Sequence, residues 1–407
     1  MRVFKAAWVV LGVFCAVNAF RVDEATGGII HARGDEEPDY SCGPAKPCEL
    51  GCCGPPPFGF CGVTDDFCQG RKTASPECAI ADGTSDKRTV GYYEGWNLAR
   101  SCGTMAPKDI PLGWYAHLNF AFALIHPTTF HVAPMDSETP KQYDAVTSLK
   151  ERQPGLEVWI AIGGWAMNDE GLYRTAFSDM ASSNANKDIF FESLIKFMEE
   201  HNFDGVDIDW EYPVASDRGG IPADFDSYAT FLRRLRERLN RTGKRYGISI
   251  AIPASYWYLR GFNLQELEPW IDWFNIMTYD IHGTWDSHVR AGACTGTPCV
   301  LSAAEINEIL DNGGVQNFYP NEAVQVVTWD TDQWVSWDDA VTLKMKMDFA
   351  NRRCLGGTMV WAIDLDDGTL IEALASNLNR TKAKVYPEQH YSCNFGTPHI
   401  EDDHDEL

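Results

Sequence analysis

The sequence predicts an α/β protein in which a TIM-type (β/α)8 barrel follows a small disulfide-rich module. Three observations indicate this fold class. From Arg88 onward, short apolar segments alternate with longer stretches whose apolar residues recur at helical spacing. Between residues 42 and 78, seven cysteines occupy a segment too short to form a hydrophobic core. The chain has 407 residues, 44% of them hydrophobic, which leaves room for a barrel of about 250 residues and further segments.

Composition restricts the class of ligand. The formal net charge of −24 and the pI near 4.7 disfavour nucleic acid and anionic membrane surfaces, so we expect neither as a partner. Aromatic residues make up 12% of the chain and include 14 Trp. Flat apolar side chains of this kind suit a neutral ligand such as a carbohydrate. We expect no metal ion, no cofactor and a monomer.

The N-terminus is typical of a secreted protein. Residues 1–19 combine a basic start, an apolar run and a small-residue site ending at Ala19, which predicts a cleaved signal peptide. An N-terminal membrane anchor is the alternative, although the apolar run is short. Cleavage would remove Cys15 and leave 12 of the 13 cysteines, an even number that suits disulfides in an oxidising compartment.

The C-terminal tail, residues 381–407, ends in His404–Leu407, the sequence HDEL. This is the address recognised by the ER-retention receptor, and an accidental match within an acidic tail is the alternative. We therefore expect a protein of the secretory pathway that is secreted or retained in the endoplasmic reticulum. Two glycosylation sequons, at Asn240 and Asn379, are consistent with this route.

Residues 20–40 are a polar linker, and residues 41–79 form the disulfide-rich module. The spacing of its cysteines lacks the paired CxxC knuckles of zinc sites, and the compartment is oxidising, so disulfides are favoured over zinc. The cysteines are Cys42, Cys48, Cys52, Cys53, Cys61, Cys68 and Cys78.

The module resembles hevein-like chitin-binding domains. An adjacent pair, Cys52-Cys53, precedes Phe58-Gly59-Phe60-Cys61-Gly62. The family's usual Ser after the pair is Gly54 here, and a stapled spacer without sugar affinity is the alternative. The resemblance implies that aromatic side chains stack on N-acetylglucosamine rings and that three disulfides form. The aromatic side chains are Phe58, Phe60 and Phe67, and the disulfides are Cys42–Cys53, Cys48–Cys61 and Cys52–Cys68.

Residues 86–380 are expected to form the barrel. Segments with strand character alternate with amphipathic stretches, which predicts parallel strands covered by helices. In such barrels the chemistry lies at the carboxyl ends of the strands. The predicted strands are TVGYYEG (89–95), AHLNFAFAL (116–124), EVWIAIGG (157–164), FDGVDIDWE (203–211), YGISIAIP (246–253), WFNIMTY (273–279) and GGTMVWAI (356–363), and the clearest helices are 187–201 and 225–240.

One predicted strand, 203–211, concentrates carboxylates. Side chains alternate along a strand, so Asp207, Asp209 and Glu211 point into the barrel and the apolar residues between them face the helices. Three acids at close range cannot all ionise, so at least one should hold a proton near neutral pH. Asp204 breaks the alternation and is expected to stabilise the turn into the strand. A hard cation would also bind clustered carboxylates, but the surrounding aromatic residues favour a sugar.

This strand matches the DxxDxDxE signature of glycoside hydrolase family 18, the chitinases. Three further motifs carry the resemblance: AIGGW (161–165), MTYD (277–280) and GGTMVWAIDLDD (356–367). The resemblance covers nearly all of residues 88–367 and is greatest to the fungal class V group. It implies a TIM barrel and hydrolysis of β-1,4-linked N-acetylglucosamine.

The resemblance also implies a role for each matched residue. Glu211 would protonate the glycosidic oxygen, and the acetamido carbonyl of the substrate would attack its own anomeric carbon. Asp209 would hold the acetamido N–H and share a proton with Asp207. Tyr279 would donate a hydrogen bond to the acetamido oxygen, and Trp361 would form an apolar floor under the reacting sugar. Substrate contacts are implied for Tyr92, Phe122, Trp165, Met277 and Asp280.

Two of these contacts have a plain alternative, because Tyr92 and Phe122 would also serve as ordinary barrel packing. Ala161 stands where the family commonly has Ser. The replacement removes a hydroxyl behind Asp207, which is expected to shift the proton balance.

The predicted barrel is incomplete. In the family, a helix, the seventh strand and the start of an inserted α+β subdomain separate the regions of Trp285 and Cys294, which are nine positions apart here. A helix and a parallel strand need a dozen or more residues. We therefore expect seven strands with two open edges, a recognised aggregation hazard. Three explanations of the gap are open: the barrel closes by another route, the protein is folded but impaired, or the sequence derives from a transcript or gene model that lacks a segment. We favour the third explanation.

Three functions fit the resemblance. Hydrolysis of chitin, with the small module holding the enzyme on the polymer, is the leading one. An endo-β-N-acetylglucosaminidase acting on N-glycans would use the same residues and suits ER retention, but not a chitin-binding module. A chitin-binding lectin without turnover is the third. Such relatives usually lose the catalytic Glu, whereas Glu211 is present here.

Overall fold

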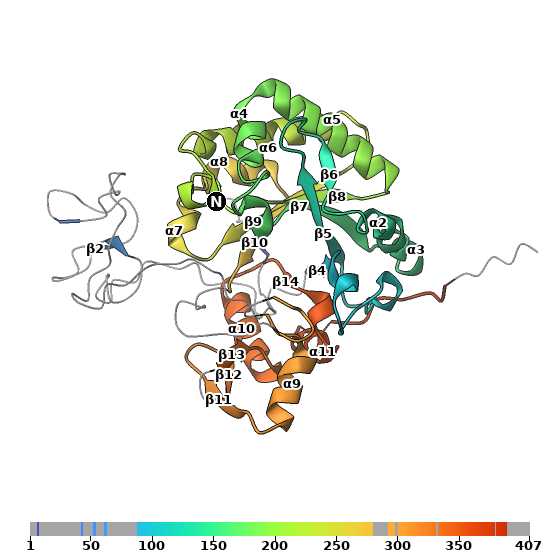
Figure 1. Ribbon diagram of the computed structural model, residues 1–407, viewed down its shortest axis with the longest axis vertical. Helices are drawn as coiled ribbons and strands as arrows, with labels where there is room; N and C mark the ends of the chain where they lie inside the picture. The colour runs from blue at the N-terminus through green and yellow to red at the C-terminus, as the bar shows by residue number, and fades with distance from the viewer. Residues whose placement is uncertain are drawn as a thin grey trace, which may run out of the picture.

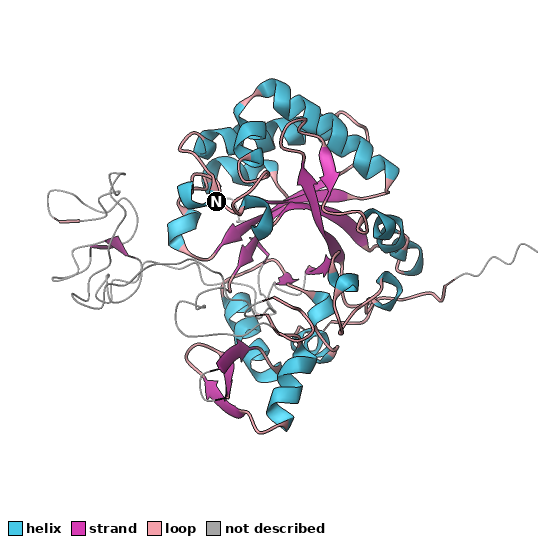
Figure 2. Ribbon diagram, in the orientation of Figure 1, coloured by secondary structure: helices cyan, strands magenta, loops and turns pink. Residues whose placement is uncertain are grey.

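The structure is a computed structural model. The residues that it describes are 6–7, 42–43, 52–53, 61–62, 88–279, 292–297, 300–330, 333–378 and 380–388. Two regions with different architectures make up most of this part, a barrel and a small α+β subdomain (Figures 1 and 2). The linker and the HDEL tail lie outside the described residues.

The barrel contains every strand that the sequence predicted. Its seven strands follow one another as parallel neighbours in the order β10-β9-β8-β7-β5-β4-β14. Within the described residues the barrel is nearly closed and has seven strands, the number that the sequence predicted. The strands are β4 (Thr89–Glu94), β5 (His117–Ile125), β7 (Glu157–Gly163), β8 (Gly205–Asp209), β9 (Gly247–Pro253), β10 (Trp273–Met277) and β14 (Thr358–Val360).

Two shorter strands extend the same sheet. β6 (Val132–Pro134) pairs antiparallel with β5. β1 (Ala6–Ala7) lies parallel to β10, with Ala6 opposite Phe274. These two residues fall within the predicted signal peptide, and they pair with the edge of β10 that faces away from β9.

Helices cover the outer face of the strands, as expected for parallel strands buried on both faces. α6, for example, turns Tyr228, Phe231, Leu232, Leu235 and Leu239 towards the core at helical spacing. The barrel helices are α2 (Pro140–Thr147), α3 (Leu149–Arg152), α4 (Ala176–Ser182), α5 (Asn184–Glu200), α6 (Asp224–Asn240), α7 (Tyr256–Leu259), α8 (Leu264–Leu267) and α11 (Thr369–Asn377).

Two indoles fill the amino-terminal end of the barrel. Trp159 on β7 stacks on Trp273 on β10, with ring centroids 4.4 Å apart and an interplanar angle of 29°. A Cβ atom at Gly247 would overlap the Trp159 indole. Glycine at this strand position therefore allows the Trp159 ring to fit. The opposite end of the barrel, at the carboxyl ends of the strands, is left for polar side chains.

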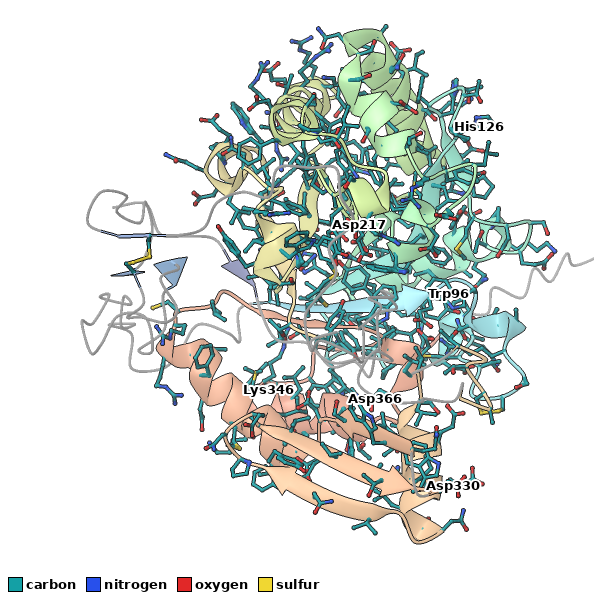
Figure 3. All side chains as sticks on the ribbon, turned by 60° about the vertical axis from the view of Figure 1, so that its left-hand side comes forward. Trp96, His126, Asp217, Asp330, Lys346 and Asp366 are labelled. Carbon is teal, nitrogen blue, oxygen red and sulfur yellow. A yellow bond between two sulfur atoms is a disulfide. The ribbon has the colours of Figure 1, made fainter. Side chains whose placement is uncertain are left out.

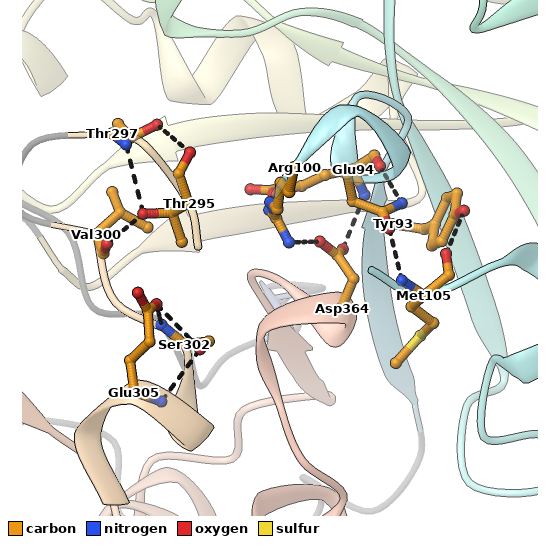
Figure 4. Close-up of polar contacts among 11 residues, drawn as sticks. Tyr93, Glu94, Arg100, Met105, Thr295, Thr297, Val300, Ser302, Glu305 and Asp364 are labelled. Atoms are coloured by element: carbon orange, nitrogen blue, oxygen red, sulfur yellow. Dashed lines mark hydrogen bonds and ion pairs between the residues drawn. The ribbon is translucent and has the colours of Figure 1, made fainter. Parts of the chain in front are cut away.

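The small subdomain follows the predicted gap. Its strands β11 (Val315–Tyr319), β12 (Val324–Trp329) and β13 (Gln333–Trp337) form an antiparallel sheet, and Ile306, Val327 and Val335 form a separate core. α9 (Ala303–Asp311) begins with a capping box in which Ser302 and Glu305 exchange hydrogen bonds (Figure 4). α10 (Ala340–Arg352), which follows this sheet, also begins with a capping box but packs on the barrel core through Leu343, Met347 and Ala350.

A disulfide between Cys102 and Cys294 joins the loop after β4 to the segment before α9 across 192 residues of sequence. This bond is one that the sequence could not assign. Among the described residues, no helix combines the length and the apolar composition that crossing a bilayer requires.

Candidate active site

The three carboxylates on β8 and directly after it lie at the carboxyl end of the barrel interior. Asp207, Asp209 and Glu211 are 0%, 4% and 7% exposed, respectively. Between them, Trp210 points outward and stacks on Phe177 of α4, with ring centroids 5.1 Å apart. The predicted alternation along this strand is therefore confirmed.

Asp204 has the structural role that its position predicted. Its carboxylate accepts hydrogen bonds from the Val158 backbone N–H at 3.0 Å and from Lys150 Nζ at 2.9 Å. It ties the start of β8 to the neighbouring strand, away from the carboxylates at the other end.

Three side chains from other strands bind Asp207. Tyr92 Oη on β4 donates to Oδ2 at 2.6 Å. Ser249 Oγ on β9 and Asn275 Nδ2 on β10 donate to Oδ1 at 2.6 Å and 3.1 Å. Burial raises the pKa of Asp207, and the three hydrogen bonds oppose the rise. A charged carboxylate is thus better tolerated here than burial alone would allow.

Ser249 corrects the expectation that was drawn from Ala161. Ala161 is the neighbour of Asp207 in the β7–β8 register and carries no hydroxyl. The hydroxyl comes instead from the opposite side, where Ser249 is the register neighbour of Asp207 on β9. The carboxylate therefore does have a serine donor, and the loss predicted from Ala161 is offset. Asn275, which was not predicted as a site residue, orders this network by donating a hydrogen bond to Tyr92 Oη at 3.0 Å.

Asp209 has the most perturbed environment of the three acids. Burial, followed by the charges of Glu211 and Asp207, raises the pKa of Asp209 well above its usual range. This agrees with the expectation that one acid of the cluster holds a proton near neutral pH. Its Oδ1 atom is buried and has no hydrogen-bond partner among the described residues. A buried polar atom of this kind needs a partner, and a bound ligand is one that would supply it.

Gly163 explains part of the AIGGW motif. It has φ +121°, and a Cβ atom there would overlap the backbone carbonyl of Asp209. The next residue, Gly164, donates its N–H to the Asp209 carbonyl oxygen at 2.9 Å. Glycine lets the chain turn here at close approach, which presents Trp165 on the loop after β7.

Glu211 is held through its backbone. Its N–H faces Asn168 Oδ1 at 3.4 Å, and its carbonyl oxygen accepts a hydrogen bond from Arg218 Nε at 3.1 Å. Arg218 also places its guanidinium 3.6 Å from the centroid of the Trp165 ring. Asn168 and Arg218 were missed by the sequence analysis, because nothing in the motif indicates which loop residues will meet.

Four aromatic rings gather beside the carboxylates. Trp361, directly after β14, lies 5.3 Å from Tyr92 and stacks on Phe122 at 5.4 Å with an interplanar angle of 21°. Trp96 extends the group by stacking on Phe122 at 5.9 Å. Tyr92 and Phe122 thus pack in the barrel as well as border the site. Trp96, labelled in Figure 3, was not predicted, although it follows the β4 strand motif by two residues.

An ion cluster fixes the base of these loops (Figure 4). Arg100 pairs with Asp364 at 2.7 Å and with Glu94, and all three side chains are at most 5% exposed. Glu94 ends β4 and Asp364 follows Trp361 by three residues. The cluster therefore joins the chain segments that carry Trp96 and Trp361.

The remaining predicted residues are placed as follows. Met277 ends β10 and is 7% exposed, and Tyr279 follows it, half-buried against the core. Asn240 is the last residue of α6. The predicted residues Asp280, Asn379, Phe58, Phe60, Phe67 and His404–Leu407 lie outside the described residues.

In the module, Cys42 and Cys53 form a disulfide, with Cα atoms 5.6 Å apart. β2 (Cys52–Cys53) and β3 (Cys61–Gly62) pair antiparallel. The other two pairings that the resemblance implies involve Cys48 and Cys68, which are outside the described residues. In the described part of the chain, no group of three or more His, Cys, Asp or Glu side chains is arranged to hold a metal ion.

Comparison with known proteins agrees with this geometry. The model of glycosyl hydrolases family 18 matches residues 88–299 and 290–366, two pieces that overlap at 290–299, next to the place where a segment was predicted to be missing. The probable chitinase LysM18 of Penicillium expansum is 36% identical over 274 residues, covering 62% of this chain and 18% of that protein. The endochitinase of Manduca sexta is 26% identical over 70% of this chain and 64% of its own length.

Solved structures share the fold. Catalytic domain 2 of the Ostrinia furnacalis group II chitinase has a TM-score of 0.67 at 24% identity, covering 74% of this chain and 98% of that one. Human YKL-39, described as a pseudo-chitinase with retained chitooligosaccharide binding, has a TM-score of 0.63 at 21% identity, covering 72% and 100%. The family match spans most of the chain and coincides with the barrel and its carboxylate strand. The chain therefore belongs to glycosyl hydrolase family 18.

Proposed function

We propose that this protein is a chitinase that hydrolyses β-1,4-linked N-acetylglucosamine by substrate-assisted, retaining catalysis. One observation carries the proposal. Asp209 Oδ1 is a buried acceptor without a partner among the described residues, and Asp209 ends the strand that carries Asp207, two residues before the acid Glu211. The acetamido N–H of a bound sugar would supply the missing hydrogen bond.

Glu211 acts as the general acid in this mechanism. It protonates the oxygen that leaves with the departing sugar, and the acetamido carbonyl oxygen of the remaining sugar attacks the anomeric carbon from the opposite side. The product of this step is a cyclic oxazolinium. Glu211, now ionised, takes a proton from water as the water opens the ring, so the configuration at the anomeric carbon is retained.

The two aspartates supply the electrostatics of the step. Asp209 begins with its proton, because burial and its acidic neighbours raise its pKa. Asp207 begins in its charged form, which Tyr92, Ser249 and Asn275 stabilise, and it takes up that proton as Asp209 becomes charged. As the positive oxazolinium forms, negative charge on Asp209 stabilises it.

Tyr279 and the aromatic floor hold the reacting sugar. Tyr279 donates a hydrogen bond to the acetamido oxygen and thereby directs it at the anomeric carbon. Trp361 lies under the apolar face of the ring, and Tyr92 and Phe122 pack against Trp361. Trp165, Met277 and Asp280 complete the sugar contacts.

The small module holds the enzyme on polymeric chitin through Phe58, Phe60 and Phe67. The signal peptide sends the protein into the secretory pathway, and His404–Leu407 engages the ER-retention receptor. One relative of this chain is named as a secreted chitinase, LysM12 of Penicillium expansum, at 26% identity.

The direct test is release of a fluorophore from a chitotriose conjugate by the full chain and by Glu211→Gln. Turnover that the substitution reduces by about 10²- to 10⁴-fold or more supports the proposal, because a positioned general acid and base typically contributes a factor of that size. Capture on chitin beads with no turnover indicates a binding protein instead. Cleavage of N-glycans from a glycoprotein without release from the conjugate indicates an endo-β-N-acetylglucosaminidase.

A further inference from the structure

We propose that Arg100 is a positioning residue for Trp361, the side chain assigned as the floor under the reacting sugar. Together with Glu94 and Asp364, Arg100 forms a buried clamp that holds the segment after β14 against the end of β4. The inference rests on the proposed function, since it concerns the same sugar site.

The segment after β14 needs a support of this kind. Among the described residues, β14 has three residues and pairs with β4 alone. A fully closed barrel would bond both edges of the strand. Trp361 follows the last residue of β14 directly. Contacts made beyond the strand are therefore important for the position of its ring.

The clamp makes such contacts three residues beyond Trp361. The Asp364 carboxylate accepts a hydrogen bond from the Glu94 backbone N–H at 3.0 Å and pairs with the Arg100 guanidinium at 2.7 Å. Arg100 also pairs with the Glu94 carboxylate. In Figure 4 the three side chains meet from β4, from the loop after it and from the segment after β14. One guanidinium thus joins two segments that are far apart in the sequence.

The charges of the clamp indicate a role in geometry. Two carboxylates and one guanidinium share a site in which each side chain is at most 5% exposed. Burial raises the pKa of Asp364 to about 6, and the charge of Arg100 opposes the rise. Buried ion pairs cost much of their attraction in lost hydration and add little net stability. Fixing two loops relative to each other is the role that such a cluster suits.

The loop that carries Arg100 is also held from its other end. Ser101 Oγ donates to the Ala293 carbonyl oxygen at 2.9 Å. The next residue, Cys102, forms the disulfide with Cys294. The guanidinium is therefore presented by a loop that is tied at both ends, as a positioning residue requires.

Both segments that the clamp joins carry rings of the aromatic group beside the acids. Trp96, four residues before Arg100, lies 6.1 Å from Trp361 between ring centroids. Both indoles stack on Phe122, at 5.9 Å and 5.4 Å. Without the clamp the two segments are free to shift against each other, and the floor loses its fixed plane. Stacking on an apolar ring face depends on that plane.

Asp364→Asn in the full chain is the primary test, because it keeps the shape of the side chain and removes its charge. Arg100 then retains Glu94 as a partner, so we expect the variant to fold. The floor contacts the sugar before and during the reaction, so its displacement removes binding that both states share. We expect KM for the chitotriose conjugate to rise about tenfold, equivalent to ~1.4 kcal/mol, with kcat within about twofold of the wild type.

Replacement of Arg100 itself tests the cation. Arg100→Met removes the clamp, whereas Arg100→Lys keeps a positive charge between the two acids. KM should rise at least as much in Arg100→Met as in Asp364→Asn and stay closer to the wild type in Arg100→Lys, because attraction to two carboxylates needs the charge more than the guanidinium fork. Equal KM values in the Met and Lys variants overturn the role of the cation. If Arg100→Met does not fold, Asp364→Asn decides.

Asp272→Asn is the matched control. Asp272 also accepts a hydrogen bond from a backbone N–H, that of Ile248 at 2.9 Å, and pairs with an arginine, Arg236, at 2.8 Å. It directly precedes β10, at the end of the strands opposite the candidate site. Its KM should equal that of the wild type. An unchanged KM for Asp364→Asn, or an equal rise for Asp272→Asn, overturns the assignment.

A spectroscopic measurement separates this inference from the proposed function. In protein labelled with fluorotryptophan, the fluorine resonance of Trp361 is the one that Trp361→Phe removes. We expect this resonance to shift in Asp364→Asn and to keep its position in Asp272→Asn, whether or not the conjugate is cleaved. If the wild type cleaves no conjugate but the resonance shifts, the proposed function fails and the clamp stands. A resonance that Asp364→Asn leaves in place refutes the clamp.

Discussion

Arg218 is predicted to hold the candidate acid and the Trp165 ring in register, and its replacement tests how the site is positioned. The side chain is 5% exposed. It donates to the carbonyl oxygens of Glu211 and Trp165, and it also pairs with Asp169 at 2.7 Å. Two chain segments, residues 165–169 after β7 and Glu211 after β8, therefore converge on one guanidinium.

The cost of Arg218→Met follows from these contacts. Two carbonyl oxygens in a buried setting would each lose a donor, at about 1–3 kcal/mol apiece. Loss of the guanidinium from the Trp165 ring adds about 0.5–2 kcal/mol. The carboxylate of Asp169 is 53% exposed, so that pair contributes at most ~1 kcal/mol. Because the contacts share one side chain, they do not add fully, and we expect a loss of about 3–5 kcal/mol.

Activity should fall as well as stability. A displacement of about 1 Å in a positioned group costs up to ~10²-fold in rate. We therefore expect kcat for the chitotriose conjugate to fall about 10- to 100-fold at a temperature where the variant is folded. Arg218→Lys should recover little of this, since an ammonium cannot bridge several acceptors in the fixed geometry of a guanidinium. Thermal unfolding and steady-state kinetics measure the two effects.

Arg234→Met is the control for removal of an arginine. Arg234 pairs with both oxygens of Asp188 between two helices, where its side chain is 23% exposed and that of Asp188 is 49% exposed. It should lose less than ~1 kcal/mol and keep wild-type kcat. An Arg218→Met variant that is destabilised but turns over at the wild-type rate would refute the positioning role and leave a purely structural one.

Three further predictions concern other contacts. Asp209→Asn should abolish conjugate turnover and raise the thermal midpoint at pH 7. The pKa of Asp209 is raised in the folded protein, so the contribution of its carboxyl group to stability is full below the ordinary Asp pKa and is lost as pH rises towards the folded-state value. The gain in thermal midpoint from the substitution should vanish below about pH 4, and a pH-independent difference would contradict the prediction. Ser249→Ala should lower kcat about 10-fold with an altered pH–rate profile, since one of three donors to Asp207 is lost; an unchanged profile would show that Asn275 and Tyr92 suffice. Cys102→Ser removes the disulfide to Cys294, which spans 192 residues of sequence. The free energy of unfolding, measured by denaturant titration, should fall by about 2–5 kcal/mol. Equal stability would show that the bond does not restrain the unfolded chain.

The strand pattern and the face of each carboxylate were predictable because they depend on local periodicity. Alternation along 203–211 was sufficient to place Asp207 and Asp209 inside and Trp210 outside, as the structure has them. The partners of Asp207 were not predictable. Ser249 meets it only because β8 and β9 pair in one register, and a shift of one residue would have turned that hydroxyl to the helices.

Loop contacts were equally inaccessible from the sequence. Arg218 meets Trp165 across 53 residues, and no periodicity encodes how two loops fold over each other. Trp96 lies only two residues beyond β4, but an aromatic residue there has no pattern that separates a site residue from packing. Proximity to a strand's carboxyl end was the one signal that would have identified it.

The position of the opening in the barrel indicates which step it affects. Among the described residues, β10 and β14 are the two barrel strands that do not pair with each other or share a neighbouring strand. Tyr279 follows β10 and Trp361 follows β14, so the proposed acetamido donor and the sugar floor sit on the two strands that lack a common neighbour. β8, in contrast, has both neighbours, and Asp207 is bonded from three strands. The acids are therefore held independently of the opening. An impaired protein would then bind the reacting sugar weakly and lose the alignment of its acetamido oxygen, while the proton-transfer groups remain in place.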